Sequence, residues 1–195
     1  MLLRLIAPLR QLMLTLLLAS MAMLIAPVVH ATEAEVTSAK LETTDEGYRI
    51  SASFAFELSR GLVDAISKEI PLSFTTEVEM TRPRWYWFDE KTIRSTQTVR
   101  IAYNTWTRHY TATINNGLQQ NFATLEDALA LVLRPRRWIV AEKGSLTPGA
   151  TYNVAVKLKL DLSYLPKTFV ITSFNDSDWR FSSDWKRFTF KVDEK

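Results

Sequence analysis

The residues best suited to chemistry in this chain form one segment, Arg82-Pro-Arg-Trp-Tyr-Trp-Phe-Asp-Glu90. Four successive aromatic residues cannot all face inward on one strand, so some of them should reach the surface. Rigid aromatic rings flanked by arginine are favoured in recognition surfaces. The alternative is a twisted strand that packs rings on both faces beneath the arginine stems. A recognition surface here would act through Arg82, Arg84, Trp85 and Trp87.

A second basic run, Arg134-Pro-Arg-Arg137, follows a predicted helix. The guanidinium groups of Arg134, Arg136 and Arg137 can bind phosphate or carboxylate groups on a partner or at a membrane surface. The alternative is a solvated helix end, where positive charges complement the helix dipole. Both basic segments are therefore candidate binding residues and not catalytic ones.

The candidates for catalysis are few. His109 lies among threonines on the expected polar face of a strand, and no nucleophile, base and orienting group can be assembled around it. Paired carboxylates for glycoside hydrolysis could be drawn from a set whose separation the sequence does not give, namely Asp89, Glu90, Asp161 and Asp178. The sequence favours a protein that is not an enzyme, and no catalytic residue is predicted.

Metal and cofactor sites are not predicted either. The oxygen-rich stretch Asn175–Asp178, with Asp184 nearby, lacks the central glycine and terminal glutamate of an EF-hand loop, so a solvated turn is the better interpretation. The five glycines are isolated from one another, which excludes a glycine-rich phosphate loop. The chain has no cysteine to provide a thiolate ligand or a disulfide.

The first 31 residues have the pattern of an export signal. Arg4 and Arg10 precede the uncharged, mostly apolar run Leu12–Ile25, and Val29-His-Ala31 resembles a small-residue cleavage site. We expect cleavage after Ala31 and a periplasmic domain over residues 32–195. The alternative is an uncleaved anchor in the inner membrane with the domain facing the periplasm. Uncharged residues extend from Gln11 to Thr32, and Pro27 interrupts them only after roughly the 20 residues that a spanning helix needs.

Loss of the signal would change the composition. Removing Arg4 and Arg10 lowers the formal net charge from +3 to +1, and removing His30 leaves His109 as the one histidine. A nearly neutral domain gives no reason to expect a nucleic-acid partner, which would require a clustered basic surface. Contact with the membrane is expected only through an uncleaved N-terminal segment.

Period-two alternation of apolar and polar residues dominates the remaining chain and predicts antiparallel strands. Two helices are expected, one after the N-cap Ser59 and one after Thr124, ending at Pro71 and Pro135. Hairpin turns are expected at Thr44–Gly47 and Asn115–Gly117. The expected strands cover Val36–Leu41, Tyr48–Glu57, Leu72–Met80, Thr92–Asn104, Trp106–Ile114, a short return to Phe122, Trp138–Ala141, Tyr152–Leu160, Phe169–Phe174 and Trp185–Val192.

This order of elements favours a mainly β fold, an antiparallel β-sandwich-like single domain with two short helices. The alternative is an α+β arrangement in which both helices pack on one antiparallel sheet.

In the strand expected from Trp106 to Ile114, the residues Trp106, Arg108 and Tyr110 should share one face.

Several blocks together resemble a proteobacterial family of exported proteins known only as a domain of unknown function. The resemblance covers nearly all of the mature chain and rests on Arg82–Glu90, Arg100-Ile-Ala-Tyr103, Arg108-His-Tyr110, Phe122–Leu129, Leu160–Lys167 and Asp178-Trp179. It implies a Gram-negative periplasmic setting and transfers no functional residue. Genes of the family often lie beside that of a membrane sensor kinase of the nitrogen-regulation type, so the resemblance also implies a signalling partner.

The sequence therefore favours a non-enzymatic periplasmic module that binds a protein, either a membrane sensor kinase or another envelope protein. Two alternatives stay open. One is an envelope hydrolase or glycan-binding protein that uses carboxylates near the aromatic segment, and the other is a structural envelope factor. No cofactor is expected in any of the three.

Overall fold

A computed structural model describes residues 34–83, 90–135, 137–165 and 179–194, with no side-chain description for residues 90–92. All of these residues belong to one compact unit, residues 31–195. The strands are β1 (Glu35–Thr43), β2 (Gly47–Ala55), β3 (Leu72–Arg82), β4 (Glu90–Asn104), β5 (His109–Ile114), β6 (Gln119–Phe122), β7 (Trp138–Glu142), β8 (Thr151–Leu160) and β9 (Lys186–Lys191). The helices are α2 (Arg60–Ser67), α3 (Leu125–Leu133) and the short 3₁₀ helix η1 (Leu162–Tyr164).

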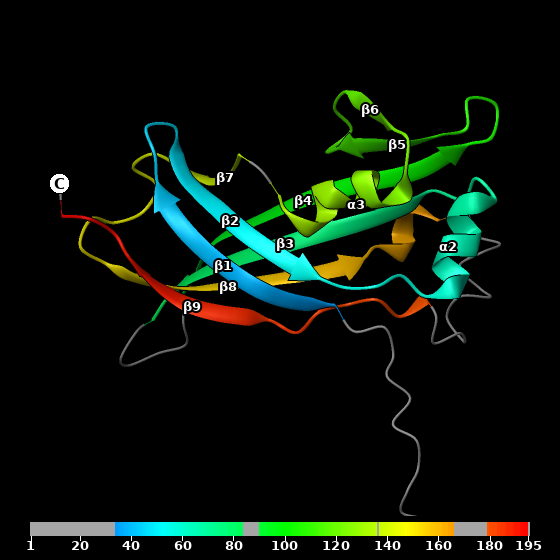
Figure 1. Cartoon of the computed structure of the whole chain (residues 1–195). Helices are drawn as coiled ribbons and strands as arrows, with labels where there is room; N and C mark the ends of the chain where they lie inside the picture. The colour runs from blue at the N-terminus through cyan, green and yellow to red at the C-terminus, as the bar shows by residue number, and fades with distance from the viewer. Residues whose placement is uncertain (1–33, 84–89, 136, 166–178, 195) are drawn as a thin grey trace, which may run out of the picture. The chain divides into compact units, whose positions relative to one another are not determined.

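The strands form two antiparallel sheets. The smaller has the order β1-β2-β7 and the larger the order β6-β5-β4-β3-β8-β9. Figure 1 shows β1 and β2 lying across the larger sheet, and β1 contacts both β8 and β9. The predicted mainly β, sandwich-like fold with two helices is thus confirmed.

The core lies between the sheets because alternate residues of each strand face inward. On β2 the inward side chains are Tyr48, Ile50, Ala52 and Phe54, all buried, and the residues between them are half-buried. Aromatic rings join the two sheets: Tyr48 of β2 meets Phe190 of β9 edge to face, with ring centroids 6.0 Å apart. Burial of these apolar side chains is the main force that holds one sheet on the other.

The helices begin where the sequence predicts. The Ser59 Oγ accepts a hydrogen bond from the Leu62 backbone N–H at 3.2 Å, and the Thr124 Oγ1 accepts one from Asp127 N–H at 3.2 Å. Helix α3 contacts β2 of the smaller sheet and β4, β5 and β6 of the larger, so it fills the space between them. It ends just before Pro135, which has no N–H to continue it.

One strand begins later than predicted. Trp106 and Arg108 lie in the turn between β4 and β5, and not on the strand, which starts at His109. The Asn104 Oδ1 accepts hydrogen bonds from the N–H groups of Trp106 and Thr107 at 3.0 and 3.1 Å, and Arg108 has a φ of 54°. A side chain that binds the backbone two residues on closes a turn and ends the ladder. The strand predicted at Phe169–Phe174 lies outside the described residues.

Candidate functional site

The predicted binding residues fall on different parts of the fold. Arg84, Trp85, Trp87 and Arg136 lie outside the described residues. Arg82 ends β3 in the larger sheet, where its Nη1 donates to the Thr147 Oγ1 at 3.5 Å.

Arg134 and Arg137 lie beside the smaller sheet instead. Arg134 is the exposed C-cap residue of α3, and Arg137 is exposed directly before β7. The described residues of the two basic segments therefore lie apart, Arg82 on β3 and Arg137 next to β7.

Arg137 borders an open hollow of about 570 Å³ together with Arg49, Ser51 and Pro135. We call these four residues the arginine hollow. Arg49 and Ser51 point outward from β2, because the residues that alternate with them along the strand face the core. β2 pairs with β7 through Arg49 and Ile139, which brings the chain just before β7 next to the outer face of β2. Two arginines from distant parts of the sequence, Arg49 and Arg137, line the same hollow in this way.

The backbone at Arg137 has an unusual conformation. Its φ is 53°, in the left-handed region that residues with a Cβ rarely adopt. Such a conformation costs on the order of 1–3 kcal/mol and persists only where the surroundings hold it. Here the pairing of β7 with β2 begins at the next residue, Trp138, and Arg137 lines the hollow beside it.

Electrostatics distinguish the two arginines. The Arg49 Nη2 donates to the Glu42 Oε2 at 3.1 Å, and Lys40 Nζ lies 2.6 Å from the other Glu42 oxygen. These contacts, Lys40 first and Arg49 second, lower the pKa of Glu42. Within the described part of the chain, Arg137 has no hydrogen-bond or ion-pair partner. The arginine hollow thus contains one partly compensated guanidinium, one uncompensated guanidinium and one hydroxyl.

A smaller hollow of about 330 Å³ shares Arg49 and Arg137 and is closed by the β1–β2 turn. Its other lining residues are Thr44, Asp45, Glu46 and Ile139. Asp45 and Glu46 place negative charge there, so an anionic group is better accommodated in the arginine hollow, whose lining has no carboxylate.

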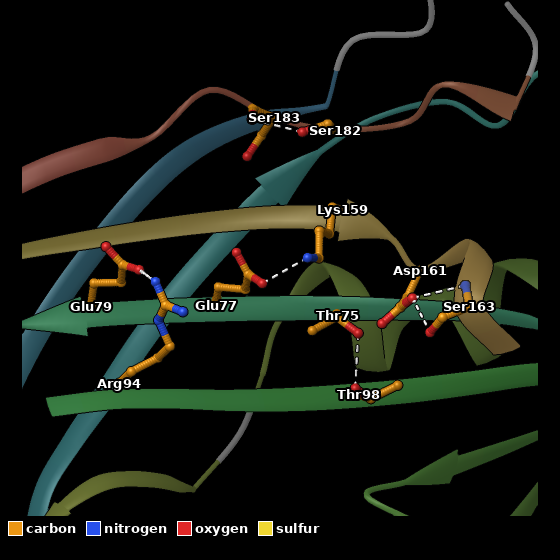
Figure 2. A network of polar contacts seen from close by, with 10 residues as sticks. All are labelled: Thr75, Glu77, Glu79, Arg94, Thr98, Lys159, Asp161, Ser163, Ser182 and Ser183. Carbon is orange, nitrogen blue, oxygen red and sulfur yellow. Dashed lines mark hydrogen bonds and ion pairs between the residues drawn. The ribbon is translucent and has the colours of Figure 1, made fainter. Parts of the chain in front are cut away.

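The outer face of the larger sheet has a separate groove of about 520 Å³ between β3, β8 and β9. Trp185, Asn153, Arg187 and Glu79 are among its lining residues, and the Lys157 Nζ lies 5.9 Å from the Trp185 ring centroid. Figure 2 shows two ion pairs made by β3: Glu79 with Arg94, and Glu77 with Lys159, whose Nζ lies 2.8 Å from the Glu77 Oε1. Charged groups of both signs therefore lie in and beside this groove.

The carboxylates considered for hydrolysis do not form a pair within the described residues. Asp161 caps η1, where its Oδ1 accepts from the Ser163 N–H at 3.0 Å and from its hydroxyl at 2.6 Å (Figure 2). Asp89 and Asp178 lie outside the described residues, as does the Asn175–Asp178 stretch, and the Glu90 side chain is not described. Asp161 therefore has a structural role in ending β8.

His109 is exposed on β5, and its Nδ1 donates to the Thr107 carbonyl oxygen at 2.5 Å. This bond stabilises the turn before β5. Among the described residues, no three histidine, cysteine or acidic side chains are grouped as metal ligands. None of the helices in the same part of the chain has the length and hydropathy of a membrane-spanning segment.

The sequence pointed to Arg134 and Arg137 but missed Arg49, Ser51 and Pro135. Arg49 and Ser51 are ordinary outward residues of an amphipathic strand, and their alternation indicates only that they face away from the core. Their role depends on the pairing of β2 with β7, a contact between distant segments. No local pattern contains that information.

Together, these features define a two-sheet β protein whose described surface has open hollows lined by charged and polar side chains. The chain belongs to the DUF4390 family, a domain of unknown function, whose profile matches residues 31–189. Searches of curated proteins and of solved structures find no match. The predicted membership of a family known as a domain of unknown function is confirmed, and its export and proteobacterial origin stay predictions.

Proposed function

We propose that the protein is a non-enzymatic binding module of the periplasm that docks a carboxylate-bearing segment of an envelope protein in the arginine hollow. The observation that carries the proposal is the pair of guanidinium groups, Arg49 and Arg137, around a lining that has no carboxylate. A planar guanidinium can hold a carboxylate through two parallel N–H···O bonds. The Ser51 hydroxyl adds a third polar group, and the Pro135 ring adds an apolar wall.

A binding role also agrees with the protonation chemistry of the region. A general acid needs a pKa raised toward neutrality. The pKa of Glu42, the carboxyl group beside Arg49, is instead lowered, so it stays ionised at neutral pH. Its role is to orient Arg49 through the 3.1 Å contact, which leaves the other N–H groups of the guanidinium free to meet a ligand.

The proposed compartment and the proposed partner rest on features of the sequence. The N-terminal pattern supports export with cleavage after Ala31, and the family resemblance supports the extracytoplasmic part of a membrane sensor kinase as the first partner to try. An acidic segment of another envelope protein would use the same chemistry. Affinity for such a partner should fall as salt is added, because exposed charges are screened.

Site-specific photo-cross-linking in cells tests the proposal. A photoreactive residue at Ser53, two positions from Ser51 on the same face of β2, should capture an envelope protein. Thr96, exposed on β4 in the larger sheet, is the control position and should not capture it. The cross-linked peptide should contain aspartate or glutamate. Equal capture at both positions, or a partner peptide without acidic residues, would contradict the proposal.

A second candidate function, glycan binding, is favoured by one observation, the groove that contains Trp185. A tryptophan ring can stack on a sugar, while the Asn153 amide and the Arg187 and Glu79 side chains supply donors and acceptors for hydroxyl groups. Titration with cell-wall glycan fragments should change the tryptophan fluorescence of the wild type and not of Trp185→Phe. No change in the wild type would exclude this candidate.

A further inference from the structure

The edges of the two sheets differ in how they are protected against pairing with another chain. Exposed edge strands offer unpaired N–H and C=O groups, and proteins protect them with charges, bulges or short length. Among the described strands, β9 has Lys186, Arg187 and Lys191, and β1 has three charged residues and a bulge between Val36 and Ser38. β7 is short and ends at Glu142.

The fourth edge, β6, has no such charge. Its sequence is Gln119-Gln-Asn-Phe122, and it pairs only with β5 among the described strands. The sequence has no Asp, Glu, Lys or Arg between Arg108 and Glu126. In Figure 1, β6 forms the outer edge of its sheet. Short length is therefore the main protection that this edge has.

Apolar side chains lie at both ends of the β6 edge, and a further exposed one lies in the turn between β4 and β5. Leu118, directly before β6, is 90% exposed, and Trp106, in the turn that precedes β5, is 95% exposed. Phe122 at the other end of β6 pairs with Tyr110 on β5 and is only half-buried. Large apolar side chains that are almost fully exposed and border an open strand edge are typical of an interaction surface.

We propose that β6 pairs antiparallel with β6 of a second copy of this chain, around a two-fold axis that passes midway between the two Gln120 residues. Residues opposite each other across an antiparallel pair lie on the same face of the sheet. A two-fold axis perpendicular to the sheet leaves every side chain on its own face of the sheet. A residue of one copy can therefore lie opposite only residues of the same face in the other copy, so the pairing must be centred on one residue and not between two. Gln120 and Asn121 are the central residues of β6 and hence the two candidates.

Centring on Gln120 makes the contacts complementary. Leu118 then lies opposite Phe122 of the second copy, so apolar meets apolar twice. Gln119 lies opposite Asn121, and Gln120 opposite itself, so amides meet amides. The Gln119 Nε2 already donates to the Asn121 Oδ1 at 3.5 Å within one strand, which shows that these two amides share a face.

A second copy is the occupant that this edge fits best. Two uncharged, amide-rich strands meet without the like-charge repulsion that the lysines of β9 would impose. Centring on Asn121 would instead place Phe122 opposite Gln120 and leave the Leu118 side chain without an apolar partner. The short interface implies a weak dimer, formed at high local concentration.

Sedimentation of the purified protein, expressed from the full-length chain, tests the proposal across a range of concentrations. The wild type should approach twice the mass of one chain as concentration rises. Gln120→Lys and Gln120→Glu place like charges on the two-fold axis, and each alone should weaken association at least fivefold. An equal mixture of the two variants should associate at least as well as the wild type.

Thr189→Lys, on the exposed edge of β9, is the matched control and should dimerise as the wild type does. Circular dichroism would verify that all variants keep the β fold. A wild type that stays monomeric at every concentration would overturn the proposal. A mixture of the two Gln120 variants that associates no better than either alone would overturn it as well.

Discussion

Gly47 is predicted to be the position where one added methyl group most disturbs the arginine hollow. It closes the β1–β2 turn with a φ of 142°, and the Thr44 N–H donates to its carbonyl oxygen at 2.8 Å. It also pairs with Glu142 of β7. A Cβ at Gly47 would lie inside van der Waals contact of the Ala141 carbonyl oxygen and 3.1 Å from the Ile139 Cγ2.

The magnitude follows from two separate costs. A residue with a Cβ in this backbone conformation is strained by about 1–3 kcal/mol. The close approach is to backbone, so β7 must move, and each backbone hydrogen bond lost costs about 1 kcal/mol. Gly47→Ala, with one such bond lost, should therefore lower the free energy of unfolding by about 2–4 kcal/mol.

Gly144→Ala is the matched control. Gly144 has a φ of 79° in the turn after β7, and a Cβ there would meet no atom within 4 Å. The Gly144→Ala variant should lose only the cost of the strained backbone, about 1–2 kcal/mol in the free energy of unfolding. Urea denaturation gives both free energies, and thermal unfolding should separate the two variants by roughly 3–6 °C. Equal losses would refute the predicted close contact between the turn and β7.

Three further predictions concern the core, a helix cap and pH. Leu158→Ala, which truncates a fully buried side chain of β8, should cost about 2–5 kcal/mol in unfolding free energy, whereas Val63→Ala on the exposed side of α2 should change it by less than about 0.5 kcal/mol. Thr124→Ala should remove the N-cap of α3 and cost about 1 kcal/mol by the same measurement; no loss would mean that the cap does not form in solution. Burial raises the pKa of Tyr48 above its ordinary value of about 10. The contribution of the neutral Tyr48 side chain to the free energy of unfolding is therefore complete below about pH 10 and is lost as pH rises through the folded-state pKa. Tyr48→Phe should therefore lose less stability than the wild type between about pH 9 and 11, and parallel profiles would contradict this assignment.

Much of the local structure could be predicted from the sequence because its signals are local. Asn115 and Asn116 take φ values of 46° and 59°, as the Asn-Asn-Gly turn requires. The caps at Ser59 and Thr124 form as expected. The predicted strand position of Trp106 is wrong because the apolar–polar alternation continues across the turn that the Asn104 side chain closes, and that turn is the stronger local signal.

The arrangement of the sheets depends on distant contacts that no local pattern contains. β3 lies between β4 and β8, and β7 joins the sheet of β1 and β2 instead of its neighbour in sequence, β8. Alternation identifies each of these strands but not its partner. The arginine hollow is a consequence of the β2–β7 pairing, which is why the sequence indicated Arg137 and gave no reason to single out Arg49.

The central claim is that Arg137 binds a carboxylate of the partner, and the affinity of matched arginine variants tests it most directly. Arg108 is exposed with a φ of 54°, almost the same backbone conformation as Arg137 at 53°, and lies in the β4–β5 turn outside the hollow. Charge-assisted hydrogen bonds contribute about 1.5–3 kcal/mol, so Arg137→Glu should weaken binding of the cross-linked partner by about 10- to 150-fold. In calorimetric titration, Arg108→Glu should stay within about twofold of the wild type, since surface changes away from an interface have small effects. Equal affinities for the two variants would contradict the claim.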